Sequence, residues 1–184
     1  MTVDELEALP DDGWVYELIE GVLVRMPPAG GEASIIGYKL GAYLTIYTQQ
    51  QRLGYVTGEQ GGYRLDPAHP RDTEVAPDVA FVKADRVPTP GSPEFRRAWE
   101  LAPDLAVEVV SPTQYKPEMK DKALFYLRFG TRLVWVIWPR QKRVDVWRPG
   151  DEKPTVLGME DVLDGEDVVP GFMFAVKDLF SFAL

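Results

Sequence analysis

The sequence contains no cysteine and only one histidine, His69, in 184 residues. Without cysteine, disulfides, thiolate metal sites and a cysteine nucleophile are all excluded. A single histidine also excludes a metal centre built from several imidazoles. A metal site in this chain would therefore use oxygen ligands, which suit hard cations such as Mg²⁺ or Mn²⁺.

Long apolar runs are also missing. No stretch of the sequence approaches the ~20 apolar residues that a membrane-spanning helix needs. The segment from Met1 to Asp12 is acidic and lacks the apolar core of a signal peptide. We therefore expect a cytoplasmic protein with no membrane partner, and the lack of cysteine fits a reducing compartment.

The composition is that of a globular protein, with 45% hydrophobic and 27% charged residues. The length predicts a single domain over residues 1–184. The net charge of −9 argues against a general nucleic-acid binder. The charge is uneven, however, because residues 112–150 hold nine Lys or Arg and three acids, a net +6. This segment is either a solvated helix and hairpin with basic edges or a surface that faces phosphates.

Periodicity and turn residues predict an α/β fold. The expected helices and strands are a helix over 2–9 capped by Thr2, a hairpin over 14–26, a helix over 33–53 and a strand over 55–65. These are followed by strands over 75–82 and 104–110 with a short helix near 93–99 between them, a helix over 118–129, and strands over 133–138 and 143–147. Residues 149–184 add short strands and a helix near 176–183. This order predicts a mixed β-sheet flanked by helices.

Two carboxylates interrupt apolar strands. Alternation places Asp78 on one face with Ala76, Ala80 and Val82, and places Glu108 between Ala106 and Val110. Burying an unpaired carboxylate costs several kcal/mol, so each must be paired, protonated or bound to a metal. If the two strands lie side by side, both acids can converge on one cation. The alternative is two strand-end acids that are satisfied by main-chain donors or an arginine.

Lys122 and Glu17 are the other candidates. Lys122 borders the apolar face of its helix and can reach toward Glu108, where a cation would stabilise charge on a phosphate. The alternative is an extended lysine paired with Glu118. Glu17 shares a strand face with apolar residues, which is out of pattern, and is either an exposed edge-strand acid or a further metal ligand.

Several motifs occur in an order that resembles the Uma-two family, within the PD-(D/E)xK nuclease superfamily. They are Tyr16–Gly21, Pro77–Val79, Val107–Pro112 and Lys122–Tyr126 followed by Gly130, and the similar core covers about residues 14–148. Trp138 stands where the family often has an aspartate, and Gly31–Ser34 lacks its frequent histidine. The resemblance implies a restriction-endonuclease-like fold and phosphodiester hydrolysis that depends on a divalent metal.

The resemblance also assigns roles to residues. Asp78 takes the position of the PD aspartate and Glu108 that of the acid in the (D/E)xK element. Val110 occupies the position of the usual lysine, which points to Lys122 on the next helix as its replacement. Glu17 matches an early family glutamate and would be an extra ligand of Mg²⁺ or Mn²⁺.

The sequence therefore supports a nuclease hypothesis, with nucleic acid, foremost DNA, as substrate. Basic residues would grip the phosphate backbone, namely Arg128, Arg132 and Arg140. A homodimer would suit cleavage of two strands. Two other function classes stay open. One is a catalytically inactive binding or assembly module whose interface uses Trp135, Trp138 and Trp147, which are otherwise core residues. The other is a hydrolase that uses two carboxylates alone, such as a glycosidase.

Overall fold

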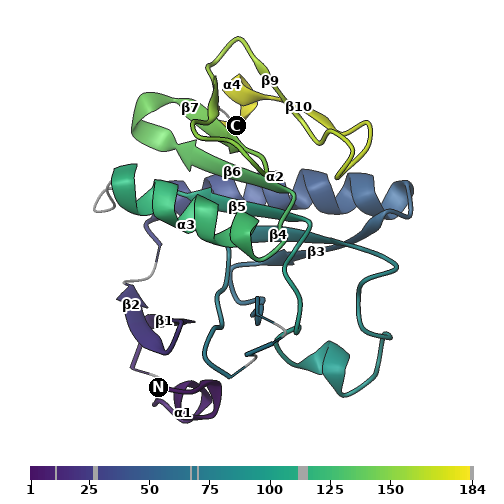
Figure 1. Cartoon of the computed structure of the whole chain (residues 1–184). Coiled ribbons are helices and arrows are strands. Elements are labelled where there is room, and N and C mark those ends of the chain that lie inside the picture. The colour runs from purple at the N-terminus through teal and green to yellow at the C-terminus, as the bar shows by residue number, and fades with distance from the viewer. Residues whose placement is uncertain (11, 27–28, 67, 70, 112–115, 183–184) are drawn as a thin grey trace.

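A six-stranded mixed β-sheet forms the centre of the computed structural model, which describes residues 1–10, 12–26, 29–66, 68–69, 71–111 and 116–182 (Figure 1). In spatial order its strands are β3 (Gly54–Gly58), β4 (Val79–Lys83), β5 (Leu105–Val109), β6 (Leu133–Trp138), β7 (Arg143–Trp147) and β8 (Thr155–Leu157). Only β5 and β6 run parallel; the other neighbours are antiparallel. A parallel pair needs a long crossover, and the helix α3 (Lys116–Arg128) provides it.

Helices cover both faces of this sheet. The long helix α2 (Gly31–Gln50) packs on one face through Ile36, Leu40 and Leu44, and α3 packs on the other through Met119 and Ala123. The two helices lie on opposite sides of the sheet in Figure 1. Because β5 and β6 are covered on both faces, they are buried throughout.

Two small hairpins flank the central layers. The first is β1 (Val15–Ile19) with β2 (Val22–Met26), near the N-terminal helix α1 (Val3–Glu7). The second is β9 (Val162–Asp164) with β10 (Met173–Ala175), which packs on the α2 side with α4 (Val176–Leu179). Two short 3₁₀ turns, η1 (Glu94–Arg96) and η2 (Pro139–Gln141), complete the elements. The first hairpin and the C-terminal hairpin lie at opposite ends of the molecule in Figure 1.

The α/β fold predicted from the sequence is confirmed, and both strands β6 and β7 have the predicted bounds. The capping box that Thr2 forms with Glu5 confirms the predicted N-cap of α1. Three tryptophans considered for an interface are instead core residues, at most 6% exposed: Trp135, Trp138 and Trp147. Among the described residues, no helix is long and apolar enough to span a bilayer.

Two predicted strands are shorter than expected. The strand predicted over 55–65 ends at Gly58, and the one predicted over 75–82 begins only at Val79. Segment 74–75 instead forms isolated bridges to Leu18 and Tyr63. The side chains therefore do not alternate regularly between the two faces from Val75 to Val79. Val75 packs on the α3 side of the sheet, whereas Val79 packs on the α2 side.

Candidate active site

Asp78 lies in a bend directly before β4, with its carboxylate held against β5. The pairing of Val79 with Val107 brings the start of β4 beside the end of β5. The main-chain N–H of Val109 donates to Asp78 Oδ2 at 2.6 Å. Burial raises the pKa of Asp78, against the opposing effects of this N–H and of the Lys122 ammonium. The antiparallel pairing therefore fixes one carboxylate beside the strand that carries the other.

Glu108 projects from β5 toward α3 and is only 5% exposed. The hydroxyl of Tyr126 donates to Glu108 Oε1 at 2.7 Å. The ammonium of Lys122 lies 3.1 Å from the same oxygen. Burial raises the pKa of Glu108 to about 8, although Lys122 acts to lower it. Burial therefore disfavours the charged form of Glu108, and a further positive charge nearby would favour it.

Lys122 turns inward from α3 and joins two acids that are far apart in the sequence. Its Nζ lies 3.2 Å from both oxygens of Glu17 and 3.1 Å from Glu108. Burial acts to lower the pKa of Lys122, but these two carboxylates outweigh it and raise the pKa. Lys122 therefore stays an ammonium at neutral pH. This favours a role in stabilising negative charge over a role in deprotonating water.

Glu17 projects from β1 and is 1% exposed. Its Oε1 accepts a hydrogen bond from the main-chain N–H of Ala76, two residues before Asp78, at 3.1 Å. Glu17 thus ties the first hairpin to the segment that leads into Asp78 and orients Lys122. The edge-strand alternative, an exposed acid, is wrong.

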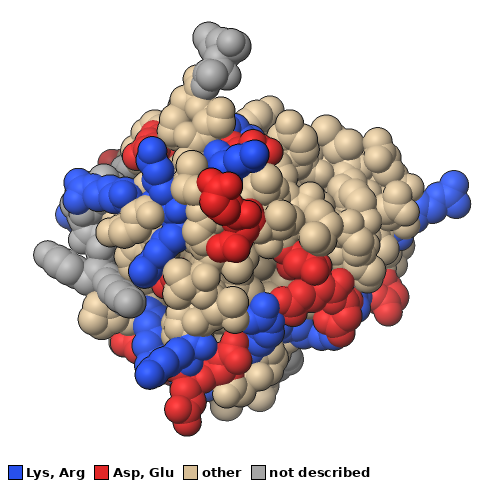
Figure 2. Space-filling model, turned by 90° about the horizontal axis from the view of Figure 1, so that it is seen from above, with Lys and Arg blue, Asp and Glu red and all other residues tan. Residues whose placement is uncertain are grey.

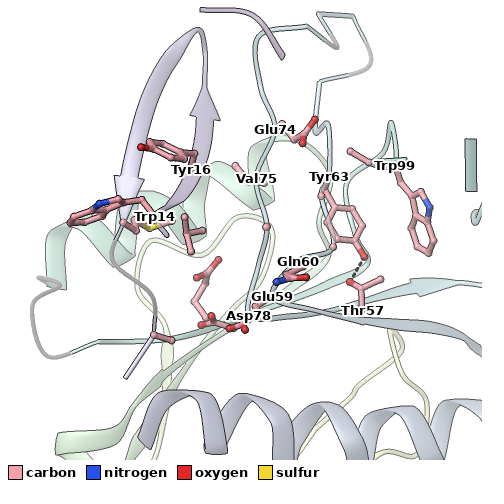
Figure 3. Close-up of a pocket in the computed structure, with 18 of the residues that line it drawn as sticks. Trp14, Tyr16, Thr57, Glu59, Gln60, Tyr63, Glu74, Val75, Asp78 and Trp99 are labelled. Carbon is pink, nitrogen blue, oxygen red and sulfur yellow. Dashed lines mark hydrogen bonds between the residues drawn. The ribbon is translucent and has the colours of Figure 1, made fainter. Parts of the chain in front are cut away.

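A cleft of ≈930 Å³ opens above this cluster, and Asp78, Glu108 and Lys122 all line it. Figure 3 shows Trp14 and Tyr16 of the first hairpin on one side, Tyr63 and Trp99 on the other, and Asp78 at the base between them. Segments distant in the sequence therefore form the walls. The hydroxyl groups of Tyr63 and Thr57 share a hydrogen bond of 2.7 Å, which holds the ring of Tyr63 in place.

The donor chemistry fits a hard divalent cation. Among the described residues, no group of three or more His, Cys, Asp or Glu is placed to hold a metal ion. Mg²⁺, however, is commonly held by one or two carboxylates together with water and substrate phosphates. Asp78, Glu108, Glu17 and Lys122 carry a net −2 when all are ionised, which one divalent cation would balance.

Comparison with known proteins identifies the family of this chain. Residues 3–177 match the family Uma2, described as "Putative restriction endonuclease". The chain belongs to the Uma2 family.

One solved structure similar to this Uma2 protein is described as a "putative nuclease belonging to DUF820", from Anabaena variabilis ATCC 29413. It has a TM-score of 0.84 and 25% sequence identity, and the alignment covers 98% of this chain and 97% of that chain. No curated protein matches. The restriction-endonuclease-like fold that the sequence motifs implied is thus the fold of this Uma2 chain.

The Uma2 motifs of this chain meet in space as a cluster. The structure brings together four sequence candidates, Asp78, Glu108, Lys122 and Glu17. It adds Tyr126, which the sequence analysis included in the motif Lys122–Tyr126 without giving it a role. The aromatic walls were not foreseen, since no local pattern links Trp14 with Trp99. Their one signal was Trp14 itself, an aromatic residue at the edge of a short hairpin.

The predicted backbone-gripping arginines lie elsewhere. Arg128 pairs with Glu20 at 2.5 Å and Arg132 pairs with Asp167. Arg140 lies in η2. Figure 2 shows several Lys and Arg side chains gathered on the left of the face seen from above. The described cations that line the cleft are a different set: Arg25, Arg96, Arg97 and Lys122.

Proposed function

We propose that this chain is a nuclease that hydrolyses phosphodiester bonds of nucleic acid with the help of Mg²⁺ or Mn²⁺. One observation carries the proposal. The buried Lys122 ammonium, 3.1 Å from Glu108, lies at the base of a cleft that Asp78 also lines. Two carboxylates and an ammonium around one point are the groups that phosphodiester hydrolysis needs. Family membership and the similar nuclease fold support the same activity.

Each residue would have a distinct task. Asp78 and Glu108 would hold the divalent cation, which would lower the pKa of water and offset charge on the phosphate. The Lys122 ammonium would stabilise negative charge that builds up on the phosphate oxygens as water attacks and the P–O bond breaks. Tyr126 and Glu17 would act as positioning residues, since one holds Glu108 and the other Lys122. Glu17 as a direct metal ligand stays a prediction.

Metal titration tests the first part. We expect isothermal titration of Mn²⁺ to show binding to the wild type and a loss of at least about tenfold in affinity for Asp78→Ala, because one of two carboxylate ligands is gone. Glu152→Ala removes an exposed acid and serves as the matched control. Equal binding by Asp78→Ala and the wild type would contradict the metal site.

Cleavage assays test the role of Lys122. On mixed DNA substrates, Lys122→Ala should lower the cleavage rate about 100-fold or more, the cost typical of losing one preorganised charge stabiliser. The exposed Lys153→Ala is the control for the general effect of removing a positive charge. If both variants cleave at the wild-type rate, Lys122 has no part in the reaction.

The alternative is a catalytically inactive module that assembles with other proteins. The tryptophans that suggested it are buried, but α2 supplies a new observation. Its outer face exposes a stripe at helical spacing, with Ile35 52%, Tyr38 82% and Ile46 56% exposed. Large apolar side chains that are exposed together on one surface often mark a contact with another protein. Figure 2 shows a broad area free of charged side chains toward the side where α2 and β10 run.

We propose that this apolar face of α2 joins two copies of the chain. Each copy has a net charge of −9, so two copies approach with least repulsion where neither presents acidic side chains. Sedimentation should give a dimer for the wild type and a monomer for Ile46→Glu, whereas Glu152→Ala should stay a dimer. A wild type that is monomeric at high concentration would refute this interface. A dimer that neither binds metal nor cleaves nucleic acid would favour the inactive module.

A further inference from the structure

Trp14 differs from the other tryptophans in being exposed. Its side chain is 40% exposed, whereas the other tryptophans are at most 7% exposed. It directly precedes β1 and lines the cleft beside the candidate active site (Figure 3). The guanidinium carbon of Arg25, on the paired strand β2, lies 3.8 Å from the centre of the indole ring. Trp14 and Arg25, here called the platform, therefore present an aromatic surface and a positive charge at one rim of the cleft.

The hairpin that carries the platform is anchored at its other end. Main-chain hydrogen bonds join Leu18 to Glu74 in both directions, and Gly21 N–H donates to the carbonyl of Asp72 at 2.7 Å. Glu17 adds the bond to Ala76. The hairpin is thus fixed relative to the segment that leads into Asp78. The platform keeps its position without needing a ligand to order it.

The cleft carries charge of both signs. Arg25 stands at one rim, and the exposed residues Arg96, the last residue of η1, and Arg97 line the opposite side. The acids Asp78 and Glu108 lie at the base, and four more acids line the cleft, namely Glu7, Glu59, Glu74 and Glu118. A phosphate backbone would meet arginines on both sides and approach the base only where the proposed metal offsets the acids.

The size of the cleft favours one strand over two. Its ≈930 Å³ is at the upper end of the range for pockets that hold one small ligand, about 300–1,000 Å³. Duplex DNA binds chiefly through many phosphate contacts over an extended basic surface, and this chain has a net charge of −9. A duplex also hides the faces of its bases, whereas an unpaired base can stack on an aromatic ring.

We propose that the cleft binds a single strand of nucleic acid, with one unpaired base stacked on the platform of Trp14 and Arg25. The base stacks on indole surface that Arg25 leaves free, and Arg25 adds attraction for the adjacent phosphate. The strand then continues over Asp78 and Glu108 toward Arg96 and Arg97. This inference deepens the proposed nuclease function and rests on it for the assignment of the base of the cleft.

Fluorescence anisotropy with short labelled strands tests the platform. We use the full chain carrying Asp78→Asn to prevent cleavage, with oligo(dT), oligo(rU) and a mixed-sequence DNA duplex as probes. Trp14→Ala should weaken single-strand binding about 5- to 150-fold, the range for losing one base stack, while Trp14→Phe should retain most of the affinity. The dT and rU probes identify which sugar the cleft prefers. Duplex binding should be weaker and insensitive to Trp14.

Tyr55→Ala is the matched control, because it removes an aromatic residue of β3 that is 42% exposed, close to the 40% of Trp14, and does not line the cleft. A second readout is tryptophan emission. Addition of oligo(dT) should quench the emission of Trp14, and this change should be absent in Trp14→Phe.

Three binding results would overturn the inference. They are unchanged single-strand binding by Trp14→Ala, an equal loss in Trp14→Phe, and tighter binding of the duplex than of either single strand. If Trp14→Ala instead changes only the oligomeric state, Trp14 is a protein contact and the inference fails. If the wild type and Trp14→Ala cleave duplex DNA at the same rate, the platform is refuted and the proposed nuclease function is supported. Binding of single strands that depends on Trp14, without cleavage by the wild type, would support the platform and refute the nuclease.

Discussion

The buried carboxyl group of Glu108 should make the metal-free protein less stable as pH rises. Burial raises the pKa of Glu108 to about 8 from an ordinary value of 4.5. Between these two pH values the folded chain keeps a proton that the unfolded chain releases. Because the folded state then binds more protons, the free energy of unfolding falls as pH rises through this window. Below pH 4.5 and above pH 8 the contribution of Glu108 is constant.

The pKa difference sets the size of the effect. One pKa unit corresponds to about 1.36 kcal/mol, so a rise from 4.5 to about 8 amounts to roughly 5 kcal/mol lost across the window. Glu108→Gln keeps the shape of the side chain and cannot ionise. From pH 5 to pH 8, the free energy of unfolding of the wild type should therefore fall by several kcal/mol relative to that of Glu108→Gln.

Urea denaturation in EDTA at several pH values measures this difference. Taking the difference removes the groups that do not interact with Glu108, and the remaining pH dependence belongs to Glu108 together with Asp78, whose charge raises the pKa of Glu108. Glu152→Gln, at an exposed acid, should show no such pH dependence relative to the wild type. The reasoning fails if Glu108→Gln has the same pH dependence as the wild type. Added Mn²⁺ should reverse the trend for the wild type, because the ion binds the ionised carboxylate and stabilises the folded state.

Three other changes test the cluster and the fold. Tyr126→Phe removes the donor to Glu108, raises its pKa further and should weaken Mn²⁺ binding at pH 7 by about tenfold; equal titrations of both proteins would contradict this. Lys122→Met should cost about 3–5 kcal/mol in urea unfolding, because it leaves Glu17 buried without a counter-charge. Adding Glu17→Gln should restore part of that loss, and strictly additive losses would argue against their pairing. Gly54→Ala should destabilise the fold by about 1–3 kcal/mol in thermal unfolding, because the added Cβ would lie 2.0 Å from a main-chain oxygen of β4. An unchanged melting temperature would be inconsistent with this close approach.

Local patterns predicted the parts of the fold that local forces control. Strand β6 has the predicted bounds because its continuous apolar run must be buried on both faces. Strand β7 also has the predicted bounds, and Lys142 makes the turn between the two strands in the left-handed region. The start of β4 was predicted too early. Val75 and Ala76 have strand-like side chains, but their hydrogen bonds go to Tyr63 and Glu17 instead of to β5.

The sequence by itself determined which groups are candidates for the chemistry. A carboxylate inside an apolar strand is costly wherever the strand lies, so Asp78 and Glu108 stood out without any tertiary information. The tertiary structure decided what those groups face. Lys122 pairs with Glu17, 105 residues away in sequence, and with Glu108, whereas helical spacing favoured the nearby Glu118. Likewise, the cleft walls that hold Trp14 and Trp99 meet only after folding, because contacts between distant segments depend on the packing of the whole chain and leave no local periodicity to read.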